Sequence, residues 1–119
     1  MLNTESFREY CLLKKGVTEE FPFDESTLVF KVMGKMFALT GLDAAEFSVN
    51  LKCDPDEALA LREKYPAVIP GYHMSKVHWN TVYIDGSIPD RLILQMIDKS
   101  YALVVQSLPK KMRDLLLNM

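Results

Sequence analysis

The chain has 119 residues, of which 49% are hydrophobic and 25% are charged, and this composition excludes an intrinsically disordered segment. Fourteen Lys and Arg residues stand against sixteen Asp and Glu residues, so the formal net charge is -2 at pH 7. Proteins that hold nucleic acid mainly through its phosphates are usually basic. The total charge therefore argues against strong non-specific binding, although a local basic face stays compatible with it. The length predicts one domain, covering residues 1–119.

The apolar runs are short and are interrupted by Lys or Asp, far below the roughly 20 residues that a membrane span needs. The first residues lack a basic start followed by an apolar stretch, so we expect no signal peptide and a cytoplasmic protein without a membrane partner. The two cysteines, Cys11 and Cys53, show no disulfide or metal-binding spacing, and we expect both to be reduced, buried thiols.

The first elements in chain order are a helix and a short strand. Asn3 is a good N-cap and Gly16 a good terminator, which predicts a helix over 3–15. An edge strand is predicted at 20–23, because Pro22 cannot donate a hydrogen bond within a central strand.

Residues 28–39 predict a β-hairpin with a type II′ turn, in which Gly34 and Lys35 are the central residues. That register pairs Val32 with Phe37. The side chains expected on the inward face are Phe30, Val32, Phe37 and Leu39. Residues 47–53 alternate between apolar and polar in the same way. The pattern predicts a sheet with one apolar face and one wet face, and helices on a single side.

The second half predicts three helices and one more strand. Asp54 and Pro55 mark the start of a helix over 54–65. A strand follows at 79–84, then a long helix over 87–108 with apolar residues at helical spacing, and a short helix over 110–117. The expected fold class is α+β, a two-layer arrangement with helices packed on one face of an antiparallel β-sheet.

No catalytic pattern accompanies these elements. The spacing of five between His73 and His78 matches neither adjacent helical turns nor one face of a strand, so we expect no metal site. Cys53 ends an apolar face, which favours an inert thiol, and the scattered glycines form no phosphate-binding loop. We therefore expect a protein that is not an enzyme and has no cofactor.

A binding surface is the better-supported interpretation. Lysines meet phosphates, Asn reads base edges and an exposed Trp stacks on bases. The residues expected on the wet sheet face, its hairpin tip and the adjoining segment are Lys31, Lys35, Lys52, Lys76, His78, Trp79 and Asn80. The competing interpretation is structural: a single Trp is often a core anchor, and lysines on a strand often keep a sheet edge soluble.

Five pieces in chain order carry a resemblance to a known family. They are Phe21-Pro-Phe23, the hairpin over 29–39, Leu51-Lys-Cys-Asp-Pro55, Tyr72-His-Met-x-Lys-x-His-Trp-Asn80 and Ile88-Pro-Asp90. Together they resemble the MmcQ/YjbR family of small bacterial proteins. The resemblance implies an α+β fold similar to CyaY-like and secretion-chaperone-like domains.

The resemblance also implies a DNA-binding role, because family members are commonly labelled as predicted DNA-binding proteins with a double-wing motif. In this sequence the tip at Gly34-Lys35 is the expected first wing, and the segment 70–80 is the second. We therefore expect a monomeric, non-enzymatic DNA-binding protein.

Two other hypotheses remain open. One is a protein-interaction or chaperone-like module, which meets a partner chain through the wet face or through the tip at Met33 and Met36. The other is a small-ligand or metal pocket around His73, His78 and Trp79.

Overall fold

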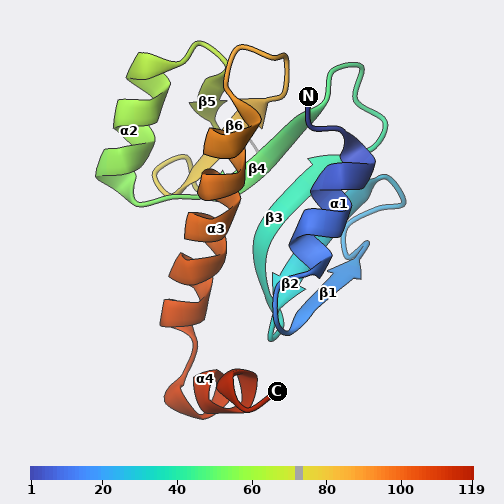
Figure 1. The fold of residues 1–119 in the computed structure, drawn as a ribbon, viewed down its shortest axis with the longest axis vertical. Coiled ribbons are helices and arrows are strands. Elements are labelled where there is room, and N and C mark those ends of the chain that lie inside the picture. Colours follow the sequence, from blue (N-terminus) through green and yellow to red (C-terminus); the bar gives the residue numbers. More distant parts are fainter. Residues whose placement is uncertain (72–73) are drawn as a thin grey trace.

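The computed structural model describes residues 1–71 and 74–119, which fold into a six-stranded antiparallel sheet and four helices (Figure 1). The strands are β1 (Val17–Glu20), β2 (Thr27–Val32), β3 (Lys35–Gly41), β4 (Ser48–Lys52), β5 (Val68–Pro70) and β6 (Trp79–Tyr83). The helices are α1 (Thr4–Leu12), α2 (Pro55–Lys64), α3 (Asp90–Ser107) and α4 (Lys110–Leu117). The strand order is β1-β2-β3-β4-β6-β5. The predicted α+β class is confirmed.

The main hydrophobic core lies between the sheet and the helices α1 and α3, which cross in front of it in Figure 1. Aromatic rings join the layers: Phe7 of α1 meets Phe30 of β2 edge to face, with ring centroids 5.4 Å apart. The helical spacing of Ile93, Ile97 and Val104 puts all three side chains in this core, as the apolar periodicity of α3 predicted. None of the described helices has the length and apolar character to cross a membrane.

The edge strand was predicted three residues too late. It runs from Val17 to Glu20, and residues 21–26 form a loop. The Asp24 carboxylate accepts hydrogen bonds from the backbone N–H groups of Ser26 and Thr27, at 2.9 and 2.6 Å. This local bonding shapes the loop that leads into β2.

The hairpin turn and register were also predicted wrongly. The central turn residues are Met33 and Gly34, with φ values of 50° and 85°, which is a type I′ turn. The strands pair Val32 with Lys35 and Phe30 with Ala38, and a β-bulge between these pairs leaves Phe37 without a partner. Phe37 and Ala38 are both buried in the main core as a result.

The bulge turns Leu39 to the face of the sheet that carries no helices, here called the outer face. Val29, Leu39 and Trp79 form a second buried cluster there, with Met36 and Met74 packed against it. The outer face is therefore not uniformly wet. This correction bears directly on the predicted binding surface, because Trp79 belongs to the cluster.

Candidate functional site

Trp79 is a packed residue of the outer face, only 7% exposed. Its neighbours are the apolar side chains of the second cluster, and Gly71 lies so close that a Cβ there would stand 3.0 Å from the Trp79 Cβ. The indole is thus positioned as an anchor of the sheet rather than as an open platform for stacking a base.

Asn80 points the other way, toward the helices, and is 2% exposed. It pairs with Leu51 across β4 and β6, and its Oδ1 accepts a hydrogen bond from Nε of Arg62 at 2.7 Å. Its Nδ2 donates to the carbonyl of Ala58 at 3.4 Å. Both partners lie on α2, so Asn80 fastens that helix to the sheet.

Two of the predicted lysines have structural partners on opposite sides of the sheet. Lys31 on the outer face forms an ion pair with Glu20 at 3.3 Å. Lys35 points its Nζ toward the carbonyl of Ser107 at the end of α3, 3.4 Å away. Lys35 therefore lies on the side of the sheet opposite Lys31.

Lys52, Lys76 and His78 do lie near one another, at the corner where β4 ends and β6 begins. Lys52 is paired with Trp79 in the sheet, and the backbone N–H of Cys53 donates to the carbonyl of His78 at 2.7 Å. The carbonyl of Lys76 accepts a hydrogen bond from Arg62. The side chains of Lys76 and His78 are exposed.

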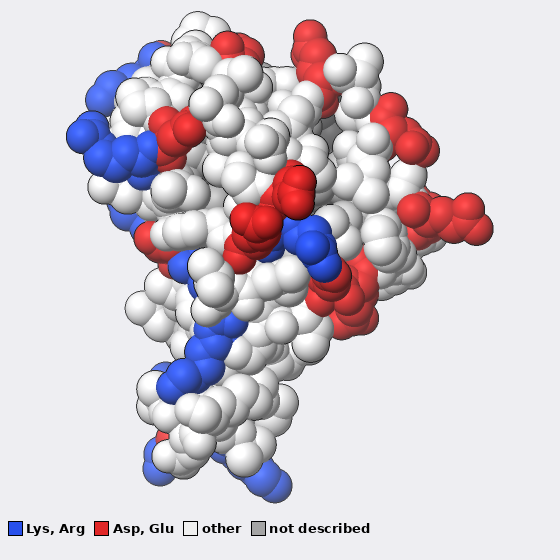
Figure 2. Space-filling view, turned by 45° about the vertical axis from the view of Figure 1, so that its right-hand side comes forward, with Lys and Arg blue, Asp and Glu red and all other residues white. Residues whose placement is uncertain are grey.

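The two expected wings do not lie together. The β2–β3 turn is at the lower end of the sheet in Figure 1, close to the end of α3, whereas residues 74–78 lie beside α2. His73, one of three residues of the predicted ligand pocket, lies outside the described residues. The face shown in Figure 2 carries acidic side chains at its centre, top and right, with basic ones beside the central group, along the left edge and at the lower end.

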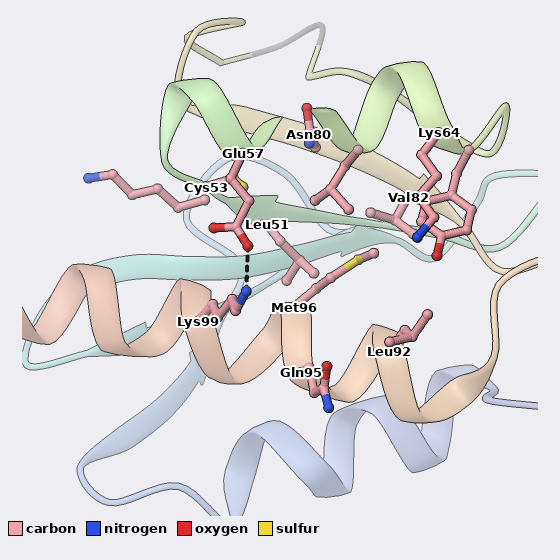
Figure 3. Close-up of a pocket in the computed structure, with 13 residues that line it drawn as sticks. Leu51, Cys53, Glu57, Lys64, Asn80, Val82, Leu92, Gln95, Met96 and Lys99 are labelled. Atoms are coloured by element: carbon pink, nitrogen blue, oxygen red, sulfur yellow. Dashed lines mark hydrogen bonds and ion pairs between the residues drawn. The ribbon is translucent and has the colours of Figure 1, made fainter. Parts of the chain in front are cut away.

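A cleft that the sequence did not reveal opens between α2 and α3, with β4 and β6 as its floor (Figure 3). Its volume is about 210 Å³. The residues that line it are Leu51, Lys52, Cys53, Glu57, Leu61, Lys64, Tyr65, Asn80, Val82, Leu92, Gln95, Met96 and Lys99. One sequence signal was available: residues 55–64 show no sustained apolar face. In the structure Ala58 is the one buried residue of α2, so this helix covers little of the sheet.

An ion pair bridges the two helices at one end of the cleft. Nζ of Lys99 on α3 donates to Oε1 of Glu57 on α2, drawn as the dashed line in Figure 3. The hydrogen bond and the charge of Glu57 raise the pKa of Lys99. Both side chains are partly exposed, so we expect the pair to contribute little to stability.

Cys53 lies beside this ion pair as a half-buried thiol. Burial raises its pKa to about 11, and the carboxylates of Glu57 and Asp54 add to the effect. The thiol is therefore protonated at neutral pH and is a poor nucleophile. Among the described residues, no group of three or more His, Cys, Asp or Glu side chains is placed to hold a metal ion.

Comparison with known proteins assigns the chain to a family. The model of the family described as YjbR matches residues 12–103. The chain belongs to the YjbR family. It is 36% identical over 111 residues to YjbR of Escherichia coli (strain K12), covering 93% of this chain and 94% of that protein. It is 40% identical over 91 residues to YbdF of Escherichia coli O157:H7, covering 76% of this chain and 75% of that protein. Both relatives are named as uncharacterized proteins.

Two solved structures share the fold. Protein DR2400 of Deinococcus radiodurans superposes with a TM-score of 0.92 at 37% identity, covering 98% of this chain and 88% of that one. A protein from Pseudomonas syringae superposes with a TM-score of 0.74 at 28% identity, covering 86% and 98%. Because the names of these proteins state no activity, the function of this YjbR-family chain follows from its own residues.

Proposed function

We propose that the protein is a non-enzymatic binding module that takes a small, largely apolar molecule in the cleft between α2 and α3. The observation that carries the proposal is the lining of the cleft. Leu51, Val82, Leu92 and Met96 supply apolar walls, and polar groups stand at its two ends (Figure 3). Ligand sites are typically concave and mostly apolar, with a few polar groups that fix orientation.

The titratable groups of the cleft favour binding over catalysis. The Cys53 thiol has its pKa raised to about 11, so little thiolate exists at neutral pH. The Glu57 carboxylate is held by Lys99 and is not poised as a free general base. These features support a site that holds a molecule without transforming it.

A blocked cleft tests this proposal. Nile red, an uncharged apolar dye, is titrated into the wild-type chain and into Met96→Trp, in which the larger side chain fills the space between the helices. We expect saturable binding to the wild type and at least about a tenfold loss in the variant, because the dye loses its apolar contacts.

The matched control is Leu115→Trp, which adds the same ring on the exposed surface of α4. It should bind the dye as the wild type does. Equal binding by all three proteins would refute the cleft as the site, provided that circular dichroism shows all three to be folded.

DNA binding is the second proposed function, and its support is the corner formed by Lys52, Lys76 and His78. Cationic and polar side chains at one corner suit phosphate contacts. Labelled duplex and single-stranded DNA should be titrated at several salt concentrations with the wild type and with Lys52→Gln/Lys76→Gln. Binding through these lysines predicts a shallower salt dependence in the variant. Anisotropy that stays flat even at low salt would eliminate this role.

A further inference from the structure

The charges lining the α2–α3 cleft are unbalanced. Three lysines and one glutamate line it, and one of these lysines, Lys52, directs its side chain outward, which leaves an excess of one positive charge in a chain whose formal net charge is -2. Lys99 and Glu57 neutralise each other. Within the described parts of the chain, no carboxylate forms an ion pair with Lys52 or Lys64. The unmatched positive charge at the cleft suits an anionic ligand.

Lys64 is the lysine best placed to meet such a ligand. It lies in the last turn of α2, and Figure 3 shows it on the side of the cleft near Val82, away from the pair formed by Glu57 and Lys99. Its Nζ lies 5.4 Å from the centroid of the Tyr65 ring. The ring keeps the ammonium group beside the apolar wall while its three N–H donors stay available to an anion.

Lys52 is less suited to this role. It lines the cleft, but its position opposite Trp79 directs its side chain toward the outer face, away from that of Leu51. The side chains of Leu51, Val82 and Met96 form the apolar surface that continues from Lys64 into the cleft (Figure 3).

We propose that the ligand of the cleft is an amphipathic monocarboxylate, with its carboxylate on Lys64 and its apolar body against Leu51, Val82 and Met96. This inference rests on the proposed function of the cleft and adds the chemical class of the ligand. The cleft has a volume of about 210 Å³. It suits a short or medium-length chain or a single aromatic ring.

Three eight-carbon molecules with different head groups test the ligand class. Octanoate, octanol and octylamine are each titrated into the full chain by calorimetry at pH 7, so that the apolar body is constant and the head is negative, neutral or positive. We expect octanoate to bind at least about fivefold more tightly than octylamine, since one exposed or half-exposed charge contact contributes about that factor. Octanol should fall between them.

Two lysine variants test the position of the head group. Lys64→Gln should bring the affinities of octanoate and octylamine within about twofold of each other and leave octanol unchanged, because only the charge contact is removed. Lys110→Gln on α4 removes an exposed lysine away from the cleft and should retain the wild-type preference. A preference for octanoate that persists in Lys64→Gln would overturn the assignment of the carboxylate to Lys64.

Different experimental results would refute this inference and the proposed function. If octanol and octylamine bind as tightly as octanoate, and Met96→Trp abolishes all three, the cleft is a ligand site but the ligand is not an anion. If none of the three molecules binds and Nile red does not bind either, both proposals are refuted.

Discussion

The Nε of Arg62 donates a hydrogen bond to Oδ1 of Asn80 over 2.7 Å, joining helix α2 to strand β6. The amide that the sequence placed on a nucleic-acid surface is thereby buried on the opposite side of the sheet. Arg62 also donates to the carbonyl of Trp79 at 3.3 Å, so one guanidinium holds the start of β6 against α2. The cleft between α2 and α3 depends on this contact for one of its walls.

Asn80→Ala should destabilise the protein by about 1–3 kcal/mol, since it leaves buried polar groups on Arg62 and Ala58 without their partner. The free energy of unfolding from urea titrations measures the effect. Asn118→Ala, at an exposed position after α4, is the control and should change stability by less than about 0.5 kcal/mol. Equal stability of the two variants would show that the Arg62–Asn80 contact does not hold α2.

The structural role of Trp79 predicts a protected indole. It is the single tryptophan of the chain, so its fluorescence reports on this site alone. We expect blue-shifted emission and weak quenching by iodide, because the ring is packed against Val29 and Leu39. Trp79→Ala should cost about 3–5 kcal/mol of stability, and the exposed neighbour His78→Ala is the control. Strong quenching in the native state would instead mean that the indole is open to a ligand.

The parts of the fold that were predicted correctly depend on local patterns. Asp54 and Pro55 predict the start of α2 correctly, and the Asp54 carboxylate accepts a hydrogen bond from the N–H of Glu57 at 3.3 Å. The core face of α3 follows from apolar spacing alone. Strand β5 was missed because it has three residues, too few to show an alternating pattern.

The site was harder to predict because it arises from tertiary placement. Glu57 and Lys99 are 42 residues apart in sequence, and nothing local indicates that they meet. The alternation of Trp79 and Asn80 along β6 puts them on opposite faces, yet both are buried, since the outer face has its own apolar cluster. The sequence pattern of one strand does not show which side chains from other elements bury its residues.

The hairpin turn gives a prediction about sequence and backbone conformation. Met33 has a φ of 50°, a region that Asn adopts more readily than Met. Met33→Asn relieves this backbone conformation but loses the packing of the half-buried Met33 side chain against the main core, so we expect the two effects to offset within about 1 kcal/mol in urea unfolding. Gly34→Ala should destabilise it by about 1–2 kcal/mol, although open space surrounds that position, because φ there is 85°. A Gly34→Ala variant as stable as the wild type would contradict the type I′ turn.

Low pH should remove the stabilising contribution of the Asp24 carboxylate in the loop after β1. The backbone N–H groups of Ser26 and Thr27 hold the pKa of Asp24 below its ordinary value of 3.8. A lowered pKa in the folded state stabilises the protein above about pH 3.8, and this contribution disappears as the pH falls through the folded-state pKa.

Substitution of Asp24 should therefore lower the stability of the protein more at neutral pH than at acidic pH. Asp24→Ala should lower the Tm at pH 7, and the difference from the wild type should shrink below about pH 3.8. Glu25→Ala is the control, because no hydrogen bond to the Glu25 carboxylate is found among the described residues. A Tm difference that stays constant from pH 7 to pH 2 would refute the carboxylate's role.

The environment of Cys53 predicts slow and strongly pH-dependent alkylation. Burial, assisted by Glu57 and Asp54, raises the pKa of this thiol to about 11, so the rate with iodoacetamide should rise about tenfold per pH unit between pH 7 and 10. Burial raises the pKa of Cys11 to about 12, and its complete enclosure should keep it unmodified until the protein unfolds.

Cys53→Ser should abolish labelling of the native chain, and octanoate in the cleft should slow labelling of the wild type. Rapid labelling of Cys53 at pH 7 would reveal a reactive thiolate and would favour a catalytic role for the cleft over simple binding.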